Sequence, residues 1–108
     1  MTGRWKGTYT CGQGLTGLDL DISDEGGGAV SAVFSFGPVE SNPNVPNGSY
    51  SMTGRLEPKL LTLTPEAWIE KPSGYVMVGL SAVLPGDDPN VLSGTVTNSA
   101  CTTFRITR

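Results

Sequence analysis

The strongest constraint on the fold of this chain is a period-two alternation of apolar and polar residues. It is clearest where Leu18, Leu20 and Ile22 alternate with two aspartates. A strand points successive side chains to opposite faces of its sheet, so such a segment has one buried face and one face in water. Similar segments recur at short, even spacing, with no helical pattern of useful length between them. This pattern is typical of all-β barrels and sandwiches.

The alternation, read with the Gly, Pro, Asn and Asp clusters between the segments, predicts about eight strands in one domain spanning residues 1–108. The expected strands cover residues 5–11, 15–22, 29–36, 49–56, 60–64, 75–84, 91–97 and 101–107. Residues 65–70 fit either a bulged continuation of a strand or one helical turn that begins at Pro65. Residues 37–48 are the longest predicted loop, and residues 85–90 are a predicted turn. Short connections favour an antiparallel up-and-down barrel, with a two-layer β-sandwich as the alternative.

The apolar faces of these strands predict the core. The expected inward residues are Leu18, Leu20, Ile22, Val30, Phe34, Phe36, Tyr50, Met52, Leu56, Leu61, Leu63, Val76, Val78, Leu80 and Val96. Side chains of this bulk occupy most of a small barrel, so a filled core is favoured over a deep lipid pocket.

The only two cysteines, Cys11 and Cys101, lie near opposite ends of the chain. A disulfide between them would close the first strand against the last, across a loop of about 90 residues worth about 4–5 kcal/mol in the chain-entropy model. Two buried free thiols are the alternative. If the two cysteines are directly opposite, alternation turns Phe104 away from the face of Tyr9. Either a bulge or a bridge outside the regular ladder would reconcile the two.

The expected disulfide also bears on location, since persistent bridges belong to oxidising compartments. The chain starts without an apolar signal region, so it is either a cytoplasmic protein or a mature or excised domain. The disulfide favours an extracytoplasmic setting, periplasmic or secreted. No apolar run approaches the roughly 18 residues of a membrane helix, so no membrane insertion is expected. The net charge is −3 and the basic residues are scattered, which argues against nucleic acid as a partner.

The tripeptide Gly3-Arg4-Trp5 opens the first expected strand, and Arg105 and Arg108 lie in or after the last. These features resemble the calycins, the lipocalin and avidin group of β-barrels. The resemblance implies that Trp5 lies inside one end of the barrel, with a basic residue of the closing strand packed over it. The chain lacks the length and helix of lipocalins and the several tryptophans of avidins, so biotin binding is not carried over. The stretch from Trp5 to Leu18 also resembles small exported bacterial domains, which implies a setting and no activity.

Catalysis is not expected, and neither is a cofactor. Histidine is absent, which removes the commonest general base and the commonest metal ligand. The aspartates beside Leu20 lie on the water-facing side of their strand, and no spacing nominates a facing pair of carboxylates. An enzyme of unrecognised type remains a lesser alternative.

The remaining hypothesis is a non-catalytic binding module that recognises a small molecule, glycan or protein at a loop-rimmed end of the barrel. The candidate ligand-binding residues are Tyr9, Arg55, Trp68 and Tyr75, for each of which a role in the core or rim is the alternative. A shallow site under the 37–48 loop fits the same hypothesis, because long loops in small domains are often functional. The rival is a structural or protein-interaction domain with a filled core and no pocket.

Overall fold

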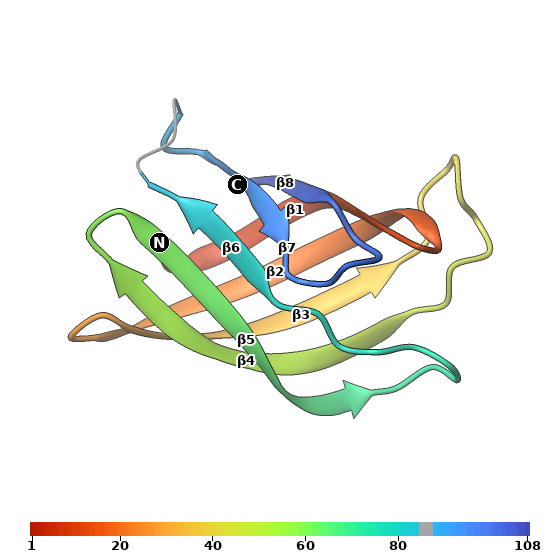
Figure 1. Ribbon diagram of the computed structural model, residues 1–108, viewed down its shortest axis with the longest axis horizontal. Helices are drawn as coiled ribbons and strands as arrows, with labels where there is room; N and C mark the ends of the chain where they lie inside the picture. The colour runs from red at the N-terminus through yellow and green to blue at the C-terminus, as the bar shows by residue number, and fades with distance from the viewer. Residues whose placement is uncertain (85–87) are drawn as a thin grey trace.

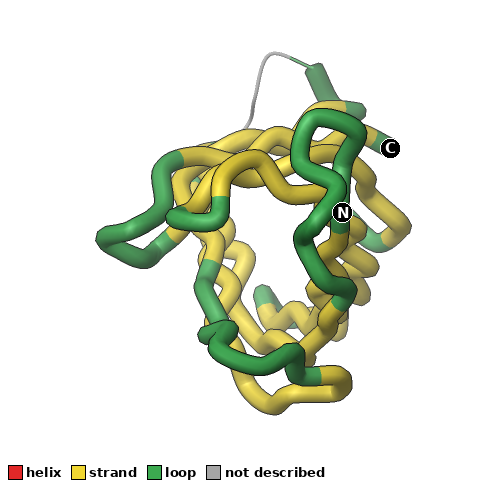
Figure 2. Tube along the Cα trace, turned by 90° about the vertical axis from the view of Figure 1, so that its right-hand side faces the viewer, coloured by secondary structure: helices red, strands yellow, loops and turns green. Residues whose placement is uncertain are grey.

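The computed structural model describes residues 1–84 and 88–108 (Figure 1). The strands are β1 (Gly3–Cys11), β2 (Gly14–Gly26), β3 (Ala29–Gly37), β4 (Gly48–Glu57), β5 (Leu60–Glu70), β6 (Leu80–Val83), β7 (Val91–Val96) and β8 (Thr103–Thr107). Each strand pairs antiparallel with the next, and β8 pairs with β1 to close a barrel. The strands therefore form a complete ring around the core (Figure 2). The up-and-down barrel is confirmed, and the sandwich alternative is wrong.

The closing ladder between β1 and β8 sets Tyr9 opposite Phe104, and both side chains are buried. Cys11 and Cys101 form a disulfide, and Cys101 lies outside β8. The last contact before the bridge is the Thr102 amide, which donates to the Thr10 carbonyl at 3.0 Å. The bridge therefore lies beyond the regular ladder. This position removes the conflict between the disulfide and the inward side of β8.

Aromatic rings fill the centre of the barrel around Phe34, which is fully buried. The Tyr50 ring stacks on Phe34 with centroids 4.7 Å apart, and the Tyr9 ring meets it edge-on at 5.2 Å. All the predicted inward residues are buried except Leu56 and Val76. Leu56 is only partly buried, and Val76 is 68% exposed.

Two glycines lie where the backbone of a neighbouring strand approaches closely. A Cβ at Gly7 would overlap the carbonyl oxygen of Arg105 on β8, and a Cβ at Gly54 would overlap that of Thr62 on β5. Both glycines lie on the inward side of their strands. Glycine within a strand often marks such a close approach of another backbone.

Residues 65–70 continue β5 as a bulged strand, so the helical turn is wrong. β5 pairs with β4 up to Glu70, and the register shifts twice, between Ser49 and Tyr50 and between Ser51 and Met52. Pro65 lies opposite Met52 within this irregular stretch. The bulges accommodate a residue that cannot donate to the ladder.

The predicted strand over residues 75–84 is wrong in its first half, because β6 begins only at Leu80. The Val78 amide donates to the Tyr50 hydroxyl at 3.0 Å, and that hydroxyl donates to the Val78 carbonyl at 2.8 Å. The buried tyrosine thus takes both backbone groups that a neighbouring strand would have satisfied. We call residues 71–79 the mouth segment.

The barrel has two unlike ends. The 12–13 turn, the 38–47 loop, the mouth segment and the 97–102 loop gather at the mouth end, on the right of Figure 1. The chain termini and the turns after β2 and β4 lie at the opposite end. The turn predicted over residues 85–90 falls partly on residues 85–87, which lie outside the described residues.

Candidate functional site

The structure separates the four candidate ligand-binding residues. Tyr9, Trp68 and Tyr75 lie towards the mouth end. Arg55 lies at the other end, opposite Ala29 at the start of β3, with its Nε 3.5 Å from Oε1 of Glu57. Arg55 therefore belongs to no common site with the other three. Because neighbouring strands of an up-and-down barrel run in opposite directions, the end of β4 and the end of β1 lie at opposite ends of the barrel.

A pocket of about 310 Å³ opens at the mouth end, and we call it the mouth pocket. It lies between the mouth segment and the disulfide that ties β1 to the 97–102 loop. Its lining consists of Tyr9, Cys11, Gly12, Gln13, Gly74, Tyr75, Val76, Val78, Asn98, Ala100 and Cys101. None of these residues carries a charged side chain. The volume lies at the small end of the usual range for ligand pockets.

A chain of hydrogen bonds fixes the polar wall of the mouth pocket. The Thr16 hydroxyl donates to the Gly14 carbonyl at 3.1 Å, so its oxygen is left to accept. Gln13 Nε2 donates to that oxygen at 3.0 Å and to the Tyr9 hydroxyl at 3.4 Å. This arrangement fixes the orientation of the Gln13 amide. The hydrogen bonds of the described residues include no acceptor for the Tyr9 proton.

Burial raises the pKa of the Tyr9 hydroxyl well above its ordinary value. The hydrogen bond from Gln13 lowers this pKa, and the neighbouring Tyr75 raises it. Desolvation disfavours the charged form of a buried phenol. Tyr9 is therefore a neutral donor throughout the physiological pH range.

Tyr75 and Trp68 both pack on Phe36 but differ in what they face. The Tyr75 ring stacks on Phe36 with centroids 5.3 Å apart and lines the mouth pocket. Trp68 meets Phe36 edge-on at 6.4 Å and Tyr50 edge-on at 5.3 Å, and it is not among the lining residues. Trp68 therefore supports the aromatic wall from the side of β5.

The sequence prediction missed Gln13 and Asn98 as pocket residues. They lie on separate turns, far apart in the chain, and neither turn carries a motif. The signal that could have found them is the disulfide, since closing Cys11 against Cys101 brings both turns together.

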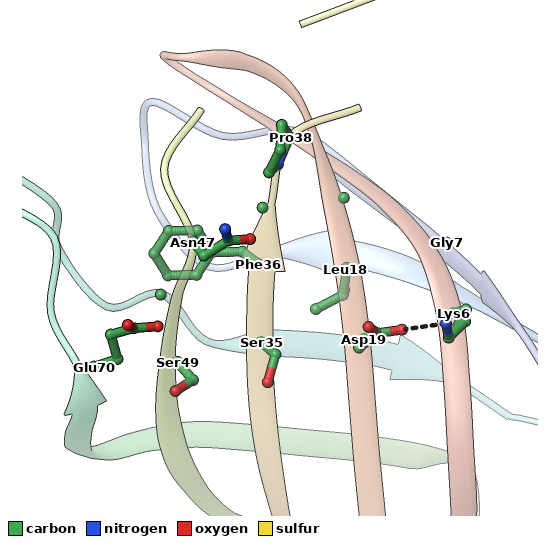
Figure 3. Close-up of a pocket in the computed structure, with 13 residues that line it drawn as sticks. Lys6, Gly7, Leu18, Asp19, Ser35, Phe36, Pro38, Asn47, Ser49 and Glu70 are labelled. Atoms are coloured by element: carbon green, nitrogen blue, oxygen red, sulfur yellow. Dashed lines mark ion pairs between the residues drawn. The ribbon is translucent and has the colours of Figure 1, made fainter. Parts of the chain in front are cut away.

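A second hollow of about 370 Å³ lies on the outside of the barrel, under the loop that joins β3 to β4 (Figure 3). We call it the outer groove. A row of polar side chains crosses it in register from β1 to β5: Lys6, Asp19, Ser35, Ser49 and Glu70. The ion pair between Lys6 and Asp19, at 3.7 Å, is largely exposed to water and contributes little to stability. The groove matches the place of the shallow site predicted under the 37–48 loop.

Of the three residues assigned structural roles, Trp5 and Arg108 lie at the end opposite the mouth pocket, whereas Arg105 lies in the middle of β8, paired with Thr8 on β1. Trp5 is buried, and the guanidinium of Arg108 lies over its ring, with Cζ 4.8 Å from the centroid. Arg105 is exposed because it alternates with Phe104 and Ile106, which both point inward. Arg108 is thus the basic residue that packs over the tryptophan.

Within residues 1–84 and 88–108, no group of three or more His, Cys, Asp or Glu side chains could hold a metal ion. The same residues include no helix long and apolar enough to cross a membrane. Fold and site together define a small, disulfide-closed antiparallel β-barrel with an uncharged aromatic pocket at one end. No protein-family model matches the chain, and neither a curated protein nor a solved structure matches it.

Proposed function

We propose that this domain is a non-catalytic binding module that holds a small molecule in the mouth pocket. The observation that carries the proposal is convergence: the β1–β2 turn, the mouth segment and the 97–102 loop together enclose one hollow with aromatic and amide walls. Ligand sites of small barrels lie at their mouths when side chains fill the interior. The buried aromatic core around Phe34 leaves the mouth as the place for a ligand.

The non-catalytic part of the proposal rests on the chemistry of the lining. Its polar groups are tyrosine hydroxyls and amides, and its two sulfur atoms are joined in the disulfide. Such groups orient a ligand by hydrogen bonds, and they include neither a carboxylate nor a thiolate for acid–base or nucleophilic work.

We further propose an extracytoplasmic setting, in the periplasm or outside a bacterial cell. The Cys11–Cys101 disulfide supports an oxidising compartment. The closed barrel and the packing of Arg108 on Trp5 are the features that a calycin-like protein would have. They support a calycin-like ancestry.

A glycan or protein partner is the second candidate, and the outer groove favours it. Its row of hydroxyl, amine and carboxylate groups offers donors and acceptors along an open surface. The rival role, a structural or protein-interaction domain, requires no ligand at the mouth.

The test is a fragment library screened by protein-observed NMR on the wild-type domain and two matched variants. Val76→Trp places a large ring at the mouth pocket from a position that is 68% exposed. Val83→Trp is the control, because Val83 is 73% exposed and lies at the end of β6 that is farther from the mouth segment. We expect hits to shift resonances of Tyr9 and Tyr75, and Val76→Trp to weaken their binding about tenfold or more, an effect of about 1.4 kcal/mol. Hits that avoid the mouth residues, or that bind both variants equally, would refute the proposal.

A further inference from the structure

We infer that the ligand of the mouth pocket is an uncharged molecule with a flat apolar body and a hydrogen-bond acceptor that receives the proton of the Tyr9 hydroxyl. This inference rests on the proposed function, because it names the chemical class for the same pocket.

The exclusion of ions follows from the lining. No Asp, Glu, Lys or Arg side chain borders the mouth pocket. An ion that enters such a site gives up its water without meeting an opposite charge, and that transfer is unfavourable. The charged row of the outer groove is on the outside of the barrel. It therefore supplies no counter-charge within the pocket.

The acceptor is specified by the hydrogen-bond chain through Thr16 and Gln13. The Tyr9 oxygen already accepts from Gln13 Nε2, and none of the described residues accepts the Tyr9 proton. Gln13 donates through Nε2 to both neighbours, which leaves its Oε1 as an acceptor. The wall thus offers one donor and one acceptor beside each other. A carboxamide or a similar neutral group complements both.

The flat apolar body is specified by the part of the lining that the mouth segment supplies. Tyr75 is held by its stack on Phe36, so its ring has a fixed orientation in the lining. Val76 and Val78 add aliphatic surface on the same segment. Aromatic rings favour offset-stacked or edge-to-face contact with another ring. A small planar ring system therefore suits this wall better than a flexible chain.

The test uses four probes of similar shape: benzamide, benzoate, benzamidinium and ethylbenzene. Their dissociation constants are measured by NMR titration of the oxidised domain and of Tyr9→Phe, which keeps the ring and removes the donor. We expect benzamide to bind about tenfold or more tightly than either ion. Tyr9→Phe should weaken benzamide about fivefold, as the loss of one net hydrogen bond predicts, and leave ethylbenzene within about twofold. Unchanged thermal melting of Tyr9→Phe controls for folding.

Two failures are distinguishable. If benzoate or benzamidinium binds at the mouth as tightly as benzamide, or if Tyr9→Phe weakens all four probes alike, the ligand class is wrong and the binding function stands. The class is also wrong if library fragments bind at the mouth and none of the four probes does. If neither fragments nor probes perturb the mouth residues, the proposed function fails together with the inference.

Discussion

The guanidinium of Arg108 lies 4.8 Å from the centre of the Trp5 ring and joins the two ends of the chain. The Arg108 side chain also donates to the Thr2 carbonyl at 3.1 Å, and the Trp5 indole donates to the Met1 carbonyl at 3.1 Å. These contacts close the end of the barrel opposite the mouth pocket. They tie the residues after β8 to those at the start of β1.

Replacing Arg108 should therefore destabilise the fold, whereas replacing Arg105 on β8 should not. We expect Arg108→Ala to lower the free energy of unfolding by about 0.5–2 kcal/mol, the range of a cation–π contact. Arg105→Ala should change it by less than about 0.5 kcal/mol, because Arg105 is exposed. Urea denaturation of both variants measures the difference. If both variants change the free energy of unfolding equally, the Arg108–Trp5 contact makes no specific contribution to stability.

Removing the disulfide should have a larger effect, because Cys11 and Cys101 are 90 residues apart in sequence. We expect the double variant Cys11→Ala and Cys101→Ala to lose about 2–5 kcal/mol of unfolding free energy, mainly through the greater freedom of the unfolded chain. Denaturation curves of the oxidised domain and the variant give this value. Alkylation followed by intact-mass measurement confirms the oxidised state. Coincident curves would contradict the assignment of a stabilising role.

Tyr50→Phe should loosen the mouth segment. The change leaves both the amide and the carbonyl of buried Val78 without their partner, at a cost of about 1–3 kcal/mol. We expect faster hydrogen exchange at the Val78 amide as well as lower global stability. Tyr75→Phe is the matched control, since the hydrogen bonds of the described residues include none to the Tyr75 hydroxyl. Slow exchange at Val78 in Tyr50→Phe would show that another group holds the segment.

Alkaline pH should unfold the domain through Tyr9 and Tyr50. Burial raises the pKa of both hydroxyls above the ordinary tyrosine value of about 10. The folded state therefore holds these protons more tightly than the unfolded state does. The stabilisation is fully present below the unfolded pKa and is lost as the pH rises through the folded pKa.

We expect the free energy of unfolding to fall above about pH 10, by up to about 1.4 kcal/mol per pH unit for each of the two tyrosines. Chemical denaturation at a series of pH values, with tyrosinate absorbance as the second probe, measures this slope. The variant Tyr9→Phe, Tyr50→Phe should show a shallower decline. An equally steep decline in that variant would assign the transition to other groups.

Much of the fold could be predicted because alternation is a local property. Leu18, Leu20 and Ile22 are all buried, as the pattern indicated. The mouth segment could not be predicted in this way. Val76 and Val78 have the same side-chain parity, yet one is 68% exposed and the other is 6% exposed.

The candidate site was predicted less well than the fold. Tyr9 and Tyr75 do line one pocket, but Arg55 lies at the far end of the barrel and Trp68 lies behind Phe36. Residue type indicated which side chains could bind a ligand. Residue type alone does not show at which end of the barrel a side chain lies.

The sequence by itself determined most of the strands and the face that each of them buries, and it favoured a disulfide between its two cysteines. These depend on side-chain period and on the identity of a few residues, both of which are local. The tertiary structure alone decided the β1–β8 register, the start of β6 at Leu80 and the burial of Val78. Each of these depends on a partner far away in the chain, such as the Tyr50 hydroxyl for Val78, and it becomes favourable only once the barrel has closed and excluded water.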